Sequence, residues 1–216
     1  EILLQLAAQA DVLLEGFRPG VMDRLGLGYA ALKAVNPRLI YCAITGYGVD
    51  GPKAERAGHD INFLALNGVL SHSGPEGAPT LPGVQIADLG GGALYAAFSI
   101  AAALFARERL GAGQCIDLAM ADGALTWNCL RWGQYIADDT VPGAGDGFLN
   151  LGFACYNIYQ TRDKRYMSVG ALEPQFWKVF CETVGHPEWN QPSYFDPGPH
   201  QKKLQQQLRI CLRKRI

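Results

Sequence analysis

The apolar positions of residues 1–137 switch repeatedly between a helical period and short uninterrupted runs. The short runs end at glycine or polar residues and predict a buried parallel strand at 11–14 and further strands at 38–45 and 114–118. The helical period predicts helices at 2–9, 29–35, 61–71, 93–109 and 119–137, with a short helix opened by Pro19. Strands and helices that alternate in this way are typical of a parallel sheet with right-handed crossovers. We therefore predict an α/β fold for this part of the chain.

The pattern changes after residue 137. Residues 138–152 are rich in Asp, Gly and Pro, which is typical of a linker. Residues 154–160 and 166–170 then alternate as the strands of a hairpin, and a helix follows at 174–184. These features predict a parallel-sheet, Rossmann-like large domain at 1–137, a linker at 138–152 and a smaller α+β domain at 153–216. The chain begins in mid-helix and ends without a helix stop signal, so we expect both domains to be incomplete.

Composition and charge exclude several classes of protein. With 49% hydrophobic residues and a net charge of −1, the chain resembles an ordinary globular protein. It lacks the excess of positive charge that is typical of nucleic-acid-binding proteins. The basic stretch at 202–215 is interpreted as the solvated face of a helix. Residues 93–106 are apolar but shorter than the ~18 residues of a membrane span, so we predict a buried helix and no membrane partner.

The six cysteines lie far apart and form no CxxC pair. This spacing argues against a zinc site, and we predict free thiols in a reducing compartment. We expect no metal. The expected location is the cytoplasm, or an organelle matrix in a eukaryote.

Three segments place an ionisable side chain beside glycine at the start of a predicted helix. They are residues 57–63, 87–92 and 169–177, which contain His59, Asp88 and Glu173 respectively. Helix starts offer unpaired N–H groups and a positive dipole end, which stabilise an anion nearby. Each side chain also has a plain structural interpretation. Asp60 and Asp88 both fit helix caps, His59 fits a structural histidine, and Glu173 fits a first-turn acid.

The chain also resembles a known family. Residues 11–20 (DVLLEGFRPG), 36–41 (NPRLIY) and 111–123 are similar to segments of the family III CoA-transferase (CaiB/BaiF) superfamily. The segment 58–63 (GHDINF) resembles the α-methylacyl-CoA racemase branch more than the typical transferases, and so does 169–177. The resemblance implies the family III fold, in which two chains interlock as a homodimer.

The resemblance also implies roles for individual residues. His59 and Asp88 match the two groups that exchange protons on opposite faces of the substrate α-carbon, and Glu173 matches a carboxylate that orients His59. Arg18 and Arg24 match positions that bind CoA phosphates. Positions lining the thioester and acyl pocket correspond to Gly58, Asp60, Phe63, Met120 and Tyr156. Phe63 replaces the more usual tyrosine, so a hydroxyl-dependent role is lost there.

The chemistry of these side chains suits a racemase of 2-methylacyl-CoA thioesters. One base removes the α-proton, and a second group reprotonates the opposite face of the enolate. Neutral imidazole is a good base near neutral pH, and a carboxylic acid in a dry pocket supplies the other proton. Backbone N–H groups near Gly58 or Gly90 are candidates to hold the enolate oxygen. No cofactor is expected, because coenzyme A is part of the acyl-CoA substrate.

Three alternatives follow from the same sequence. In the transferase branch Asp88 would be a nucleophile that forms an aspartyl-CoA intermediate. A nicotinamide-dependent oxidoreductase would need a GxGxxG turn, and the Gly90–Gly92 run has the wrong spacing. An inactive fragment that acts only as a binding partner or scaffold is the third alternative. The identity of the acyl group stays open.

Overall fold

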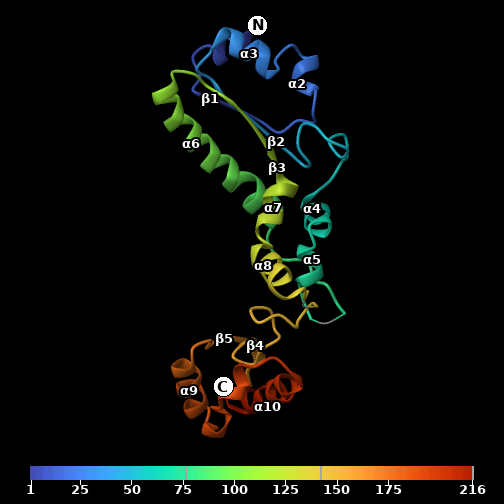
Figure 1. The fold of residues 1–216 in the computed structure, drawn as a ribbon, viewed down its shortest axis with the longest axis vertical. Helices are drawn as coiled ribbons and strands as arrows, with labels where there is room; N and C mark the ends of the chain where they lie inside the picture. Colours follow the sequence, from blue (N-terminus) through green and yellow to red (C-terminus); the bar gives the residue numbers. More distant parts are fainter. Residues whose placement is uncertain (76, 142, 216) are drawn as a thin grey trace. The chain divides into compact units, whose positions relative to one another are not determined.

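A computed structural model describes residues 1–75, 77–141 and 143–215, and the chain divides into two compact units (Figure 1). The first unit contains Glu1–Leu70 and Leu81–Asp139, and the second contains Ser71–Thr80 and the residues from Thr140 onward. The division after Asp139 falls inside the predicted linker. Residues 71–80, which the sequence analysis placed in the large domain, group with the second unit.

A parallel sheet of three strands organises the first unit. Its strands, in spatial order, are β1 (Val12–Glu15), β2 (Ile40–Thr45) and β3 (Cys115–Ala119). Both pairings are parallel, with Val12 opposite Ile40 and Tyr41 opposite Cys115. β2 lies in the middle and is buried except at Ile44, which explains its uninterrupted apolar run. The prediction of a buried strand at 11–14 is wrong, because β1 lies at the edge of this sheet and Leu14 is 56% exposed. The predicted α/β fold with a parallel sheet is confirmed.

Helices cover the two faces of this sheet. They are α1 (Ile2–Ala7), α2 (Val21–Arg24), α3 (Tyr29–Val35) and α6 (Leu94–Leu110). Alternate side chains of β2 point to opposite faces. Tyr41 and Ala43 pack with Leu32 of α3, whereas Cys42 packs with Ala96 of α6. Figure 1 shows α6 running along the sheet.

The prediction that α6 is a buried helix is wrong. Only Ala96 and Ala103 are buried, because the sheet covers one side of the helix and the opposite side carries exposed Phe98 and Phe105. The π-helix η1 (Ile86–Ala93) directly precedes α6 in the sequence. The two helices together form a stretch of 25 residues, Ile86–Leu110, with a mean hydropathy of 1.7. By length and composition alone this stretch is apolar enough to cross a membrane. Its packing on β2 and β3 makes it a layer of the sheet domain.

Five further short helices lie in the sequence between the end of β2 and residue 138. They are α4 (Asp60–Leu66), α5 (Val69–His72), the π-helix η1 (Ile86–Ala93), α7 (Met120–Thr126) and α8 (Cys129–Asp138). The predicted single helix at 61–71 is interrupted at Gly68, whose φ of 75° is left-handed. The predicted helix at 119–137 is likewise divided, at Trp127 and Asn128. No pattern in the sequence indicated a π-helix at 86–93.

The second unit is a small α+β unit. Its elements are the strands β4 (Tyr156–Gln160) and β5 (Tyr166–Gly170), the helices α9 (Pro174–Thr183) and α10 (Pro199–Arg215), and the 3₁₀ turns η2 (Pro187–Trp189) and η3 (Pro192–Phe195). The predicted antiparallel hairpin is confirmed. Tyr159 and Trp177 are buried in the core with Leu204 and Leu208 of α10. The charged side chains of α10 up to Lys214 are exposed, which confirms the interpretation of 202–215 as a solvated helix face.

Candidate active site

His59 and Asp60 occupy the start of α4. His59 is the N-cap residue and is exposed, and its N–H donates to the side chain of Asn62 at 3.0 Å. This bond is the return half of a capping box, and it fixes the backbone at His59. Asp60 follows as the first residue of the helix and is only 8% exposed. The helix start therefore places an accessible imidazole next to a buried carboxylate.

The Asp60 carboxylate joins α4 to the π-helix η1. Its Oδ1 accepts hydrogen bonds from the backbone N–H groups of Ala87 at 2.6 Å and of Asp88 at 2.9 Å. The alternative in which Asp60 merely caps its own helix is therefore wrong, because His59 is the N-cap of α4 and Asp60 bonds to a different helix. This contact connects two segments that are more than twenty residues apart in the sequence.

Asp88 is the third residue of η1 and is partly buried. Burial is the main cause that raises the pKa of its carboxyl, and the negative charge of Asp60 raises it further. The imidazole of His59 acts in the opposite direction and lowers the same pKa. Because Asp60 adjoins His59 and binds the N–H of Asp88, the first unit brings the segments that carry His59 and Asp88 together. The alternative in which Asp88 caps the long helix is wrong, because Ala93 is the N-cap of α6.

The glycines after Asp88 allow the backbone of η1 to pass in direct contact with the backbone of α7. A Cβ on Gly91 would lie 2.6 Å from the N of Ala124, and a Cβ on Gly123 would lie 2.0 Å from the O of Gly91. No side chain fits at this crossing. At the next position, a Cβ on Gly92 would lie 2.9 Å from Cγ of Met120. The glycine run therefore has a packing function that positions Asp88.

Gly58 and Phe63 form part of the support beneath His59. Phe63 is 1% exposed and meets Tyr47 edge-to-face, with the ring centroids 5.1 Å apart. A Cβ on Gly58 would come within 2.7 Å of the Phe63 ring and 2.9 Å of the Tyr47 hydroxyl. Met120 is half-buried at the start of α7, beside the π-helix. The predicted role of these residues in binding the substrate stays a prediction.

The two predicted phosphate-binding arginines follow β1. Arg18 lies in the exposed loop after the carboxyl end of this strand, and Arg24 ends α2. In the described part of the chain neither guanidinium forms an ion pair. The carboxyl ends of parallel strands are the usual place for ligands in α/β sheets. Their position is compatible with the predicted role, which stays a prediction.

The loop after β2 reaches the same edge of the sheet and was only partly anticipated. Its backbone is held by side chains of the sheet, since Thr45 accepts from the N–H of Gly48 at 2.9 Å and Asp117 accepts from that of Val49 at 3.2 Å. The glycines at 46–51 indicated a loop here, but no sequence pattern indicated that Asp117 of β3 would hold it.

The other two predicted residues lie in the second unit. Glu173 is the exposed N-cap of α9, and its side chain makes no capping hydrogen bond. Tyr156 begins β4 and lines a cavity of ≈ 430 Å³ together with Val169 and Gly170. Within this unit, Glu173 and Tyr156 thus keep side-chain atoms available for further contacts.

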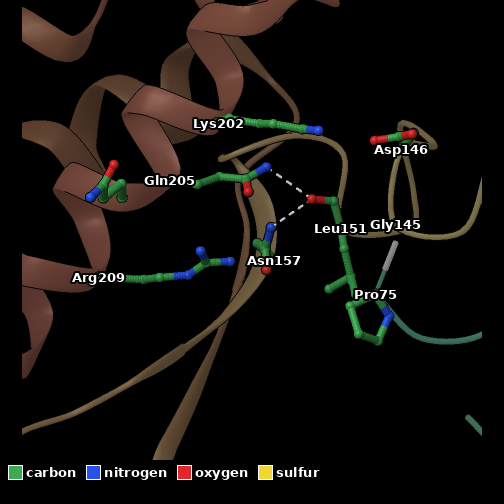
Figure 2. Close-up of a pocket in the computed structure, with 9 residues that line it drawn as sticks. Pro75, Gly145, Asp146, Leu151, Asn157, Lys202, Gln205 and Arg209 are labelled. Atoms are coloured by element: carbon green, nitrogen blue, oxygen red, sulfur yellow. Dashed lines mark hydrogen bonds between the residues drawn. The ribbon is translucent and has the colours of Figure 1, made fainter. Parts of the chain in front are cut away.

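A second cavity of the same unit, ≈ 470 Å³ in volume, contains none of the predicted site residues (Figure 2). Figure 2 shows Asn157 and Gln205 directed at one carbonyl oxygen, that of Leu151, to which they donate at 2.8 and 2.9 Å. Lys202 and Arg209 of α10 line the rim, with Asp146 from the preceding loop. The cavity is polar and mixed in charge.

Within residues 1–75, 77–141 and 143–215, no group of three or more His, Cys, Asp and Glu side chains is placed to hold a metal ion. All six cysteines are free. Burial raises the pKa of the Cys42 thiol in the sheet to about 11, which makes it a poor nucleophile at neutral pH.

Known proteins resemble the chain over nearly its whole length. The model of CoA-transferase family III matches residues 1–216. The α-methylacyl-CoA racemase of Mus musculus is 40% identical over 205 residues, which are 94% of this chain and 54% of the racemase. The acetyl-CoA:oxalate CoA-transferase of Acetobacter aceti is 38% identical over 189 residues, which are 87% of this chain and 48% of the transferase.

A crystal structure of a CAIB/BAIF family protein from Brucella suis superposes with a TM-score of 0.81 at 32% identity. The alignment covers 99% of this chain and 56% of that protein. The chain spans about half the length of the curated relatives it matches. The parallel sheet, the second α+β unit and the family match agree with one another, and the chain belongs to CoA-transferase family III.

Proposed function

We propose that this chain is the acid/base part of an α-methylacyl-CoA racemase-type enzyme. In this proposal His59 and Asp88 transfer protons to and from the α-carbon of a 2-methylacyl-CoA. The observation that carries the proposal is the hydrogen bond from the Asp88 N–H to Asp60, which joins the segment that carries Asp88 to the helix start that carries His59. Similarity to both a racemase and a transferase leaves the reaction type to be decided by this site.

The electrostatics of Asp88 favour the proton-transfer role. Burial and the neighbouring Asp60 both favour its protonated form. A protonated carboxyl donates a proton to an enolate, but it is a poor nucleophile toward a thioester. His59 is exposed, so an incoming substrate can reach its imidazole. In the transferase alternative a histidine base beside the aspartate has no function.

The remaining parts of the proposal concern binding. Arg18 and Arg24 are proposed to hold the CoA phosphates, because a guanidinium pairs bidentately with phosphate oxygens. Glu173 is proposed to orient His59. Tyr156 is proposed to line the thioester and acyl pocket together with Gly58, Phe63 and Met120. Coenzyme A enters as part of the substrate, so the scheme needs no separate cofactor.

A homodimer is part of the same proposal. The side of α6 that faces away from the sheet exposes Phe98 at 73% and Phe105 at 63%. Exposed aromatic side chains in such a row are typical of a surface covered by protein. In a homodimer, Glu173 and Tyr156 of one chain would serve the His59–Asp88 pair of the other.

The test uses the full-length protein with one epimer of a 2-methylacyl-CoA in deuterium oxide. We expect inversion of the α-carbon and incorporation of deuterium there. His59→Ala and Asp88→Ala should each lower the rate of inversion by about 100- to 10,000-fold, as for loss of a general acid or base. Absence of exchange with any branched acyl-CoA would contradict the proposal.

Two controls separate the alternatives. Hydroxylamine added with acyl-CoA would trap an activated Asp88 if this residue were a nucleophile, and we expect no such product. Calorimetry with CoA tests the scaffold alternative. Binding of CoA by the wild type supports an enzyme, and absence of binding would leave only the scaffold.

A further inference from the structure

Asp60 performs for the π-helix the function that an N-cap residue performs for its own helix. The two N–H groups that it binds belong to the second and third residues of η1, which are the positions where an N-cap side chain acts. The side chain of Gln85, the N-cap residue of η1, makes no capping hydrogen bond. The cap of η1 thus comes from α4, a separate element.

This contact fixes the backbone of Asp88. Ala87 is fully buried, so its N–H has no access to water if Asp60 is removed. A buried donor without a partner costs about 1–3 kcal/mol, which makes the bond to Asp60 costly to break. The N–H of Asp88 itself is held as well, at 2.9 Å. The direction in which the Asp88 side chain leaves the backbone therefore depends on Asp60.

The same carboxylate is one of two charged groups that act on Asp88. The elements packed against η1 are α4, α6, α7, β2 and β3. α4 and its N-cap contribute Asp60 and His59, which act on Asp88 with opposite sign. The carboxylates of Asp117 on β3 and Asp122 on α7 are exposed. Asp60 is thus placed to favour the protonated state of Asp88.

We propose that Asp60 is a positioning residue for Asp88: its buried carboxylate holds the backbone at the start of η1 and places a negative charge next to Asp88. This inference rests on the proposed function, in which Asp88 supplies a proton to the α-carbon. It gives Asp60 a role that differs from lining the acyl pocket. It also explains why an acidic residue lies buried beside another acid.

Two variants separate the geometric role from the electrostatic one. Asp60→Asn keeps an oxygen acceptor for the two N–H groups and removes the charge. Asp60→Ala removes both. Asp117→Asn is the matched control, because Asp117 also accepts from a backbone N–H in this unit, that of Val49. All are made in the full-length protein.

The first readout is a carbon-13 NMR titration of the Asp88 carboxyl, assigned with Asp88→Asn. The second is the pH profile of inversion in the direction in which Asp88 donates the proton. Removing a negative neighbour lowers the pKa of an acid, so Asp60→Asn should titrate Asp88 at lower pH than the wild type. Inversion in this direction needs protonated Asp88 and should then decline at lower pH. Asp60→Ala should in addition lose about 100-fold in kcat, through misplacement of the carboxyl.

An unchanged titration of Asp88 in Asp60→Asn, equal to that of Asp117→Asn, would overturn the inference. A lower pKa in Asp60→Asn alone supports it, even if Asp60→Ala fails to fold. The NMR titration needs no substrate. A wild type that shows no exchange would therefore contradict the proposed function, while the titration still decides the role of Asp60.

Discussion

The two units of this chain present their predicted site residues in different ways. In the first unit, His59 and Asp88 come from segments that are bound to one another through the Asp60 carboxylate and through a glycine crossing. In the second unit, Glu173 is an exposed N-cap without a capping bond, and Tyr156 lines an open cavity. Contacts between separate segments of the first unit fix the backbone around His59 and Asp88. Glu173 and Tyr156 are placed by the helix and the strand that they begin.

This difference is compatible with the roles that we propose for the four residues. Groups that exchange protons with a carbon need fixed positions, and the first unit supplies them with buried hydrogen bonds and backbone contact. Groups that orient or enclose a substrate can come from a surface that meets the site only in the assembled protein. Substitutions in the first unit should therefore affect folding and chemistry together, and those in the second should affect chemistry alone.

The largest effect is expected at the crossing of η1 and α7. Gly123→Ala would place a Cβ 2.0 Å from the O of Gly91, so the two backbones must separate. We expect a loss of about 3 kcal/mol in the free energy of unfolding, at the upper end for overpacking, with loss of exchange activity. Gly133→Ala in α8 is the control, because a Cβ there meets nothing within 4 Å. It should stabilise the protein by about 0.5–1 kcal/mol, and urea unfolding measures both.

A smaller effect is expected in the second unit. Glu173→Gln should reduce kcat for exchange by less than the ~100-fold that marks loss of a proton-transferring group, with the melting temperature unchanged. The control is Glu182→Gln on the same helix, where Glu182 lies 3.9 Å from Lys178 in an exposed pair of little energetic value. A Glu173→Gln protein that unfolds at lower temperature would show that Glu173 is structural, and equal kcat in both variants would exclude an orienting role.

The smallest effect concerns the cost of Asp88 to stability. Its carboxyl has a raised pKa in the folded chain, so the ionised form destabilises the fold as pH rises above the unfolded value. Asp88→Asn removes this cost and should raise the melting temperature by about 2 °C or less at neutral pH. Well below the unfolded pKa of about 3.9 the carboxyl is protonated in both states, and the difference should disappear. Calorimetry at the two pH values would contradict this if the variant were less stable at neutral pH.

Much of the fold could be predicted from local patterns. An uninterrupted apolar run predicted β2, because this strand is buried on both faces, and alternation predicted the β4–β5 hairpin. The exposure of α6 was not predictable, because an apolar helix on the side of a sheet has the same pattern whether or not its other side is covered. The divisions at Gly68 and Trp127 depend on contacts distant in sequence.

The sequence could supply candidate site residues, but it could not supply the contacts between them. His59 and Asp88 were proposed from their setting among glycines and from the family resemblance, and their role in catalysis stays a prediction. The bond from Asp60 to η1 joins positions 27 and 28 residues apart, which no spacing rule relates. The π-helix itself was missed, because its sequence has the composition of an ordinary glycine-rich loop.

The central claim is that His59 and Asp88 act on opposite faces of one α-carbon. The most direct measurement incubates each epimer of a 2-methylacyl-CoA separately in deuterium oxide with the full-length wild type, with His59→Ala and with Asp88→Asn. We predict that both variants lose inversion, and that each retains deuterium exchange with one epimer only, the opposite one in the two cases. Equal exchange from both epimers in either variant would contradict the claim.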